Sequence, residues 1–214
     1  MIDKTLHKRL LDIAYKYQLH HLGSYFSSID IIDEIYSKMQ KEDIFILSNG
    51  HASVALYVVL EKYFKLDAEH LLNKLGEHPK RDEKSKIHCS TGSLGMGITV
   101  AVGRAIVSEG KNVYCLISDG ECYEGSVWES LRFANEMKIN NLKIYVNANG
   151  YAAYKSVNLK ILEKNLKSFL PEIEFRKTTV SQYGLSGLSA HYDQMTEEMY
   201  IKATSELSKW EESS

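Results

Sequence analysis

Two polar residues follow two apolar segments of the sequence and could together bind a cation. Asp119 comes after the apolar run at 112–117, and Asn149, thirty positions beyond Asp119, comes after the run at 142–146. In a parallel α/β sheet, ligands bind beyond the carboxyl ends of the strands, so both side chains would lie at the binding edge. A carboxylate, an amide oxygen and a backbone carbonyl are hard oxygen ligands. They suit Mg²⁺ or Ca²⁺, with phosphate oxygens and water completing about six sites.

The residues next to this pair favour an anion beside the cation. Gly120 lets the backbone turn sharply and approach a ligand. The following helix starts nearby, so its free N–H groups and the positive end of its dipole would attract negative charge. The competing interpretation is that Asp119-Gly120 and Asn149-Gly150 are only turns, and for Asp-Gly alone that interpretation is preferred. The fixed separation of the pair, with each member after a strand, favours a site.

The segments that would position the pair alternate between strands and helices. Strands separated by a helix of this length imply a βαβ unit and a parallel sheet with a right-handed crossover. The sequence predicts strands at 43–47, 112–117, 142–146 and 174–180, and helices at 3–18, 29–40, 52–64, 68–75, 98–108, 127–137, 158–169 and 194–210. Ser27 or Ser28 is expected to cap the second helix, and 76–86 is expected to be a surface loop.

Composition narrows the class of protein. The 214 residues are 44% hydrophobic, which is ordinary for a globular domain. A net charge of −2 gives no general case for nucleic acid or an acidic membrane surface. No segment approaches the roughly 18 consecutive apolar residues of a transmembrane helix, and the charged N-terminus lacks the apolar core of a signal peptide. Three cysteines without metal-type spacing suit reduced thiols, so we expect a cytoplasmic protein.

Six short motifs, in register along the chain, resemble the N-terminal half of transketolases. The stretch from Asp119 to Asn149 resembles the thiamine-diphosphate motif, which opens with Gly-Asp-Gly and closes with asparagine. The six motifs are HLGSYFS at 21–27, LSNGHAS at 47–53, His-Pro at 78–79, STGSLGMG at 90–97, DGECYEGSVWE at 119–129, and Asn-Leu at 141–142 with Asn-Gly at 149–150. The resemblance covers residues 1 to about 155, and it resumes at 178–198, where His191-Tyr192 is similar to a motif before the family's last helix.

The resemblance implies the thiamine-diphosphate-binding fold, which is α/β and doubly wound, with a mainly parallel sheet and helices on both faces. It implies that residues 1–214 form a single diphosphate-binding domain. It also implies that Asp119, Asn149 and the carbonyl of Tyr151 ligate Mg²⁺ or Ca²⁺. The implied cofactor-binding residues are Gly92, Ser93, Leu94, Asp119, Gly120, Glu121, Glu124 and Asn149. The implied catalytic residues are His21, His51, His78 and His191, and histidine suits proton shuttling since it titrates near neutrality.

The titratable residues that are not assigned a catalytic role are interpreted as follows. Glu124 and Glu129 match family positions at a subunit interface, where carboxylates share protons, and a solvated helix face is the alternative. Cys122 is interpreted as a small, partly buried thiol. Surface or satisfied core side chains are expected for the remaining histidines, which are His7, His20, His70 and His88.

The chain departs from the family pattern in three places. Ser118 stands where the family has the first motif glycine, and Asn147 stands where it has an aspartate near the metal. After Tyr151 the family has roughly thirty more residues, so 156–214 is expected to be a shortened C-terminal part of the domain.

Transketolases also carry a pyrimidine-binding domain, and nothing in this sequence resembles it. We therefore expect a separate C-terminal subunit with that domain and a heterotetramer with the cofactor between the chains. The expected reaction transfers a two-carbon ketol unit between sugar phosphates or modified sugars. The helices at 52–64 and 98–108 are expected to serve a large apolar interface. The alternatives are a subunit of another thiamine-diphosphate enzyme and a non-catalytic scaffold or regulator. A Mg²⁺–nucleotide binder is disfavoured, because the sequence has no Walker lysine and no GxGxxG.

Overall fold

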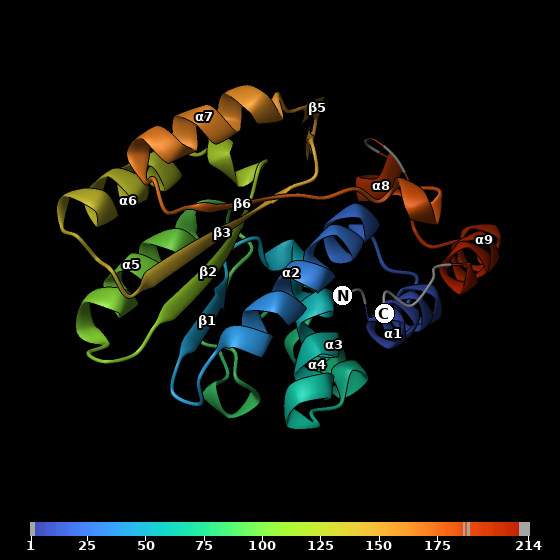
Figure 1. Ribbon diagram of the computed structural model, residues 1–214. Helices are drawn as coiled ribbons and strands as arrows, with labels where there is room; N and C mark the ends of the chain where they lie inside the picture. Colours follow the sequence, from blue (N-terminus) through green and yellow to red (C-terminus); the bar gives the residue numbers. More distant parts are fainter. Residues whose placement is uncertain (1–2, 186, 188, 210–214) are drawn as a thin grey trace.

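The centre of the molecule is a sheet of four parallel strands (Figure 1). The computed structural model describes residues 3–185, 187 and 189–209. Within them the strands lie in the order β1 (Ile44–Leu47), β2 (Val113–Ser118), β3 (Leu142–Ala148) and β6 (Glu174–Lys177). Ser118 pairs with Asn147, so β2 and β3 end side by side. The predicted parallel sheet is confirmed, with β6 ending three residues earlier than expected.

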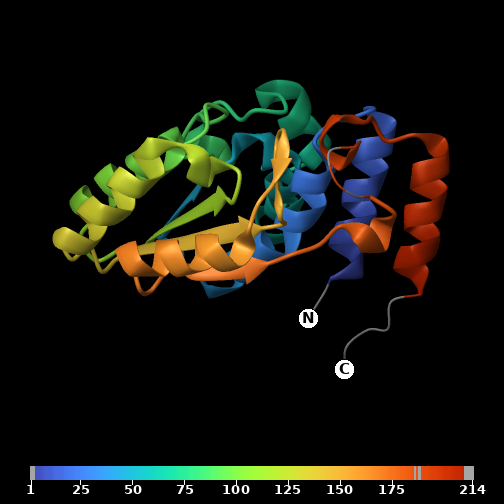
Figure 2. The ribbon, with the colours of Figure 1, turned by 90° about the horizontal axis from the view of Figure 1, so that it is seen from above.

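Side chains alternate between two hydrophobic cores, one on each face of the sheet. In β2, Tyr114 and Leu116 pack into one core, while Cys115 and Ile117 pack into the other. The first core contains residues of α1 (Lys4–Lys16), α2 (Leu22–Lys38), α3 (Ser53–Phe64) and α4 (Ala68–Leu75). The second contains residues of α5 (Met96–Val107), α6 (Gly125–Glu136) and α7 (Leu159–Phe169). Helices therefore cover both faces, which confirms the predicted α/β class (Figures 1 and 2).

The largest departure from the predicted elements is the start of α2, which begins at Leu22 rather than near residue 29. His21 precedes it in the left-handed region, with φ of 60°. At Gly23, an added Cβ would lie 3.1 Å from Cβ of Ala190, so the missing side chain lets the C-terminal segment pack closely. Burial of residues 22–29 outweighs the low intrinsic helix propensity of their glycine and serines.

The predicted caps of this helix have a different role. Ser27 and Ser28 lie inside α2, and their hydroxyls accept hydrogen bonds of 2.7 and 2.9 Å from Nδ2 of Asn147. The prediction that one of them caps the helix is therefore wrong. The two serines instead join α2 to the end of β3.

Before the predicted last helix, the chain beyond β3 contains several short elements that the sequence patterns did not predict. A hairpin pairs β4 (Tyr151–Ala152) with β5 (Lys155–Ser156). After β6 come η4 (Ser181–Tyr183), α8 (Ser189–Tyr192) and α9 (Glu197–Ser208). The last helix starts later than predicted because the side chain of Thr196 caps it. Trp210, at the predicted end of this helix, lies outside the described residues.

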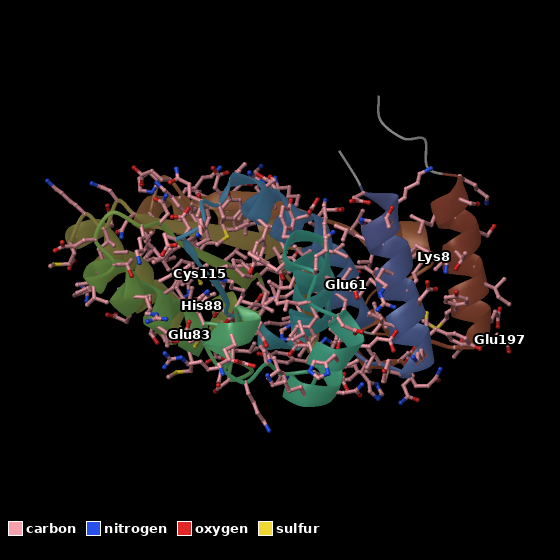
Figure 3. The ribbon with its side chains drawn as sticks, turned by 90° about the horizontal axis from the view of Figure 1, so that it is seen from below. Lys8, Glu61, Glu83, His88, Cys115 and Glu197 are labelled. Carbon is pink, nitrogen blue, oxygen red and sulfur yellow. The ribbon has the colours of Figure 1, made fainter. Side chains whose placement is uncertain are left out.

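Helix α9 returns to pack beside α1 at one side of the molecule (Figure 2). The rings of Tyr15 and Tyr200 stack with centroids 4.6 Å apart. Lys8 of α1 contacts the Tyr200 hydroxyl at 2.9 Å, and Figure 3 shows it on the helix next to α9. The loop predicted at 76–86 contains a short helix, η2 (Glu83–Ser85).

Two further findings bear on the predictions from composition. The cysteines at positions 89, 115 and 122 are free. Within the described ranges, no helix has the length and apolar character needed to cross a bilayer.

Asn141 closes the end of α5. Its Nδ2 donates to the backbone carbonyls of Ala105, Ser108 and Lys111 at 2.9, 3.1 and 3.0 Å. Carbonyls in the last turn of a helix have no partner within the helix, so this one amide satisfies groups that would otherwise be orphaned. It also fixes the turn from α5 into β2.

We predict that Asn141→Ala lowers the free energy of unfolding by about 1–3 kcal/mol, because partly buried carbonyls lose their donor. Urea denaturation would measure the change. The adjacent Asn140 is exposed, so Asn140→Ala is the matched control and should change stability by less than about 0.5 kcal/mol. Equal losses in the two variants would contradict the role given to Asn141.

Candidate functional site

A cavity of about 380 Å³ opens where β2 and β3 end. It is lined by the metal-binding and catalytic residues that the sequence suggested, together with segments from the C-terminal region. Of the predicted residues, the lining contains His21, His51, His78, Gly92, Leu94, Asp119, Gly120, Glu124, Asn149, Tyr151 and His191. Ser93 and Glu121 do not belong to it.

Asp119 and Asn149 lie on neighbouring strand ends, as their spacing predicted. The Asp119 side chain is fully buried, and its Oδ2 accepts a hydrogen bond of 2.7 Å from the Gly150 N–H. Its Oδ1 accepts one of 2.9 Å from the Gly120 N–H. The Asn149 Oδ1 accepts from the Tyr151 N–H at 3.0 Å. The carboxylate therefore joins the two turns directly.

The surroundings of Asp119 fit a bound cation. Burial raises the pKa of its carboxyl group to about 7, although the N–H groups of Gly150 and Gly120 oppose the rise. In the described part of the chain, no lysine or arginine pairs with this carboxylate. A divalent ion would supply the missing positive charge.

The donor types agree with this interpretation. Among the described residues, no group of three or more His, Cys, Asp or Glu side chains could hold a metal. A site here must therefore use amide and carbonyl oxygens as well as the one carboxylate, as Mg²⁺ and Ca²⁺ sites do. Gly120 lets the turn after β2 lie close to the β4–β5 hairpin, because an added Cβ would lie only 3.3 Å from Cα of Ala152. The residues present thus fit a metal and a diphosphate.

Four histidines from segments far apart in the sequence gather on one side of the cavity. The ring of His21 lies 5.6 Å from that of His51, 5.8 Å from that of His78 and 4.7 Å from that of His191, between centroids. The backbone N–H of His21 donates to the carbonyl of His191 at 3.0 Å, which ties the start of α2 to α8. The Nδ1 atom of His21 is buried without a hydrogen-bond partner among the described residues.

Burial keeps three of these histidines, His21, His51 and His191, neutral at physiological pH. Burial, aided by the neighbouring histidines, lowers the pKa of His51 to about 3 and that of His21 to about 4. Burial also lowers the pKa of His191. Neutral imidazoles can both accept and donate a proton, whereas charged ones can only donate. The cluster can therefore accept protons and hydrogen-bond hydroxyl groups of a ligand.

The glycine-rich loop before α5 packs against this cluster. Gly92 has φ of +145°, and an added Cβ would come within 2.9 Å of the ring of His78. At Gly50, which precedes His51, an added Cβ would lie 2.5 Å from the carbonyl carbon of Thr91. The loop and the histidine segments thus approach backbone to backbone, which requires glycine.

The two predicted cofactor-binding residues that miss the cavity have visible reasons for doing so. Ser93 is exposed, and its carbonyl accepts from the Met96 N–H at 3.3 Å. Glu121 is fully buried and outside the cavity lining, and burial raises the pKa of its carboxyl group. Its contact with a cofactor stays a prediction, and in this fold its carboxyl oxygens accept hydrogen bonds from the surrounding loops.

Glu124 lines the cavity at the start of α6, and Glu129 is exposed on that helix. Glu129 pairs with Arg132 at 3.0 Å, as in a solvated helix face. Cys122 is buried, and its Sγ donates to the Ser118 carbonyl at 3.4 Å. The interface role of the two glutamates stays a prediction.

The two departures from the family pattern are accommodated locally. The Ser118 hydroxyl accepts from the N–H of Glu121, the first residue of η3 (Glu121–Tyr123), at 3.1 Å. The Asn147 side chain is buried, donates to the serines of α2 and accepts from Thr178 Oγ1 at 2.6 Å. Neither residue leaves an unpaired side-chain group near Asp119.

The histidines given plainer interpretations lie outside this cavity. His7 is buried and bonded to Asp30 at 2.7 Å, which makes it a satisfied core side chain. His88 pairs with Glu83 at 2.7 Å on another part of the molecule (Figure 3). The two remaining ones, His20 and His70, are exposed.

Sequence reasoning missed the C-terminal wall of the cavity. The β4–β5 hairpin contributes Ala152, Ala153 and Tyr154, and residues 179–181 contribute a second strip. The Lys155 ammonium lies 4.1 Å from the ring centroid of Tyr123, which holds the hairpin near η3. Strands of two residues leave no periodic pattern, so no sequence signal could have found them.

Residues 10–170 match the family described as "Transketolase, thiamine diphosphate binding domain". The chain belongs to this family. The matched range contains Asp119, Asn149 and His51, while His191 lies beyond it.

The chain is also similar to bacterial proteins that are named as subunits of transketolases. It is 33% identical over 163 residues to a subunit of the apulose-4-phosphate transketolase of Phocaeicola vulgatus, covering 66% of this chain and 57% of that one. It is 28% identical over 165 residues to the 6-deoxy-6-sulfo-D-fructose transketolase subunit SqwG of a Clostridium species, covering 68% and 60%. The chain thus spans somewhat over half the length of these curated relatives.

A solved transketolase from Campylobacter jejuni has the same fold. The TM-score is 0.73 at 21% identity, covering 97% of this chain and 43% of that one. The human transketolase is 40% identical over 119 residues, which are 50% of this chain and 19% of that one.

We predict that His51 makes stability depend on pH. Its pKa is about 3 in the fold against 6.5 for the free side chain, so between these values the unfolded state binds more protons. Stability therefore falls as pH falls from about 6.5, by up to about 1.4 kcal/mol per pH unit from this residue. His51→Gln should flatten the slope in urea denaturation between pH 4 and 6. His70→Gln, at an exposed position, is the control; identical slopes for wild type and His51→Gln would refute the prediction.

Proposed function

We propose that this chain is the thiamine-diphosphate- and Mg²⁺-binding subunit of a transketolase that transfers a two-carbon ketol unit between sugar phosphates or modified sugars. The observation that carries the proposal is the single cavity shared by the Asp119–Asn149 pair and four histidines. Family membership supports thiamine diphosphate as the cofactor. A cytoplasmic location stays a prediction.

In this proposal Asp119 and Asn149 hold Mg²⁺ through their side-chain oxygens, and Tyr151 adds its carbonyl. The ion would join these residues to the diphosphate, while Gly120 lets that group lie against the backbone. Thiamine diphosphate, when bound, supplies the electron sink for breaking a carbon–carbon bond.

The histidine cluster handles hydroxyl groups and protons. Because burial keeps His21 and His51 neutral, each can accept a proton from a donor hydroxyl or hydrogen-bond to it. His78 and His191 complete the wall. The apolar residues Leu94, Val180 and Leu185 line the same space and exclude water.

The substrate's charged group would need a partner chain. Among the described residues that line the cavity, there is no lysine or arginine, so these residues offer no cationic side chain for a phosphate or sulfonate. We propose a second subunit with a pyrimidine-binding domain, in a heterotetramer with the cofactor between the chains. Two relatives are named as subunits of transketolases, which supports this arrangement.

One of the two helices expected at the interface remains suited to it. On α5, Met96, Ile106 and Val107 are 53%, 52% and 74% exposed, which leaves an apolar face for a partner. Most of α3 is buried in the first core, so we propose α5 rather than α3 as the interface element.

A scaffold without catalysis is the competing class. Three departures from the family pattern favour it, namely Ser118, Asn147 and the roughly thirty residues missing after Tyr151. The first two are accommodated by local hydrogen bonds. A non-catalytic scaffold also gains nothing from burying the Asp119 carboxylate, because burying a charge without an opposite charge is costly. Cofactor binding separates the two classes.

We predict that thiamine diphosphate with Mg²⁺ raises the thermal midpoint of this chain together with its partner subunit, and that chelation by EDTA removes the rise. At cofactor concentrations 100-fold above Kd, the stabilisation is about 2.7 kcal/mol. Calorimetric titration would measure the affinity directly. Absence of binding to the reconstituted pair would refute the catalytic proposal.

We predict that Asp119→Ala abolishes Mg²⁺-dependent cofactor binding and leaves the fold intact, because the only carboxylate of the proposed metal site is lost. Asp193→Ala is the control, since Asp193 is exposed and outside the cavity lining. Circular dichroism would report the fold and calorimetry the affinity. Unchanged affinity in Asp119→Ala would reject the ligand assignment.

A further inference from the structure

Glu121 connects three segments near the cavity, which are the segment before His51, the glycine-rich loop before α5 and the end of β2. Its Oε1 accepts hydrogen bonds from the Ser48 hydroxyl at 2.5 Å and from the Gly95 N–H at 2.7 Å. Its Oε2 accepts from the Ser118 N–H at 3.3 Å. In return, the Ser118 hydroxyl accepts from the Glu121 N–H. These two reciprocal hydrogen bonds between Ser118 and Glu121 resemble a capping box and satisfy two backbone donors.

Each of these partners precedes or ends a functional segment. Ser48 follows β1 and leads into η1 (Gly50–Ala52), which carries His51. Gly95 ends the glycine-rich loop of Gly92 and Leu94 and is the N-cap of α5. Ser118 ends β2 directly before Asp119. One carboxylate therefore touches the histidine segment, the glycine loop and the metal turn.

The three segments meet with few side chains between them. At Gly97, an added Cβ would lie 2.5 Å from Cα of Ser48. At Gly50, it would lie 2.5 Å from the carbonyl carbon of Thr91, next to the glycine loop. Backbones this close leave little room for interdigitating side chains to fix the spacing. The hydrogen bonds of Glu121 fix it instead.

Stability alone does not explain a carboxylate here. Glu121 has no exposed surface, and none of the ion pairs of the described residues includes it. Burying a charge without an opposite charge is costly, and apolar replacements of buried charged groups are often neutral or stabilising. The geometric effect on the loops is the benefit that remains.

We propose that Glu121 is a positioning residue that sets the spacing of the His51 segment, the glycine loop and the Asp119 turn, and thereby the affinity for thiamine diphosphate and Mg²⁺. This inference rests on the proposed function, and it assigns no contact between Glu121 and the cofactor.

The test compares Glu121→Leu, Glu121→Gln and Asn141→Ala. The leucine variant loses all three acceptor bonds. The glutamine variant differs from glutamate at a single atom and keeps one oxygen as an acceptor. Asn141→Ala is the destabilised control, because Asn141 caps α5 away from the cavity.

Two readouts are measured well below the unfolding temperature. The first is amide hydrogen exchange of residues 48–53, 92–97 and 118–120 in this chain without cofactor. The second is the Kd of thiamine diphosphate with Mg²⁺ for the complex with the partner subunit. We expect faster exchange in all three segments of Glu121→Leu, and a loss of affinity of about 10- to 100-fold, as for other residues that orient metal ligands. Glu121→Gln should show the same changes to a smaller extent, and Asn141→Ala should show neither.

The outcomes separate this inference from the proposed function. If the wild-type complex binds no cofactor, the proposed function fails, and the exchange data alone decide whether Glu121 holds the three segments together. If Glu121→Leu does not fold, Glu121→Gln takes its place in both measurements. Wild-type exchange in the three segments together with wild-type Kd, in whichever variant folds, would overturn the inference. So would an affinity loss of equal size in Asn141→Ala.

Discussion

The buried hydrogen bond between Asp119 and the Gly150 N–H is the contact around which the site is arranged. It joins the turn after β2 to the turn after β3, and thereby fixes how the two strand ends face each other. The carboxylate reaches this position only because Gly120 lets the chain pass close to Ala152. Its negative charge lies in a place from which water is excluded. Two N–H groups compensate that charge only in part, and a divalent ion would complete the compensation.

The histidine cluster depends on packing at the opposite end of the chain. His21 reaches the cavity because α2 begins immediately after it, and its backbone is bonded to His191 of α8. The C-terminal segment is also held to α1, because the Tyr183 hydroxyl is hydrogen-bonded to His7. His7 in turn bonds to Asp30 of α2. Buried polar contacts of this kind specify one arrangement of the segments, because each group loses its partner in any other.

The sequence predicted those parts of the site that depend on local patterns. Asp119 and Asn149 could be found because a residue type at a strand end is a property of a short segment, and parallel strands bring such ends together. The four histidines followed from motifs of a few residues. By contrast, the orientation of Glu121 and Ser93 depends on how three loops pack against one another, and no local pattern contains that information. The motif implied that both contact the cofactor, whereas the fold buries Glu121 and leaves both residues outside the cavity lining.

The same distinction explains the elements that differ from prediction. The long helices were predicted because their apolar faces repeat with the helical period. The first turns of α2 were not predicted, because glycine and serines have a low helix propensity and resemble a break in the helix. Their packing against Ala190 and Asn147, which the structure shows, is not visible in the sequence. The β4–β5 hairpin was not predicted either, because its strands are two residues each. Both missed features form walls of the cavity, so the sequence predicted several of the residues that gather at the cavity better than the space around them.

The central claim is that Asp119 and Asn149 anchor a diphosphate through a divalent ion. The most direct measurement is a crystal structure of the chain with its partner subunit, thiamine diphosphate and Mn²⁺, with the ion located by anomalous scattering. The account predicts an ion about 2.0–2.3 Å from side-chain oxygens of Asp119 and Asn149, with diphosphate oxygens completing its coordination. An ion or a diphosphate bound away from these two residues would contradict it.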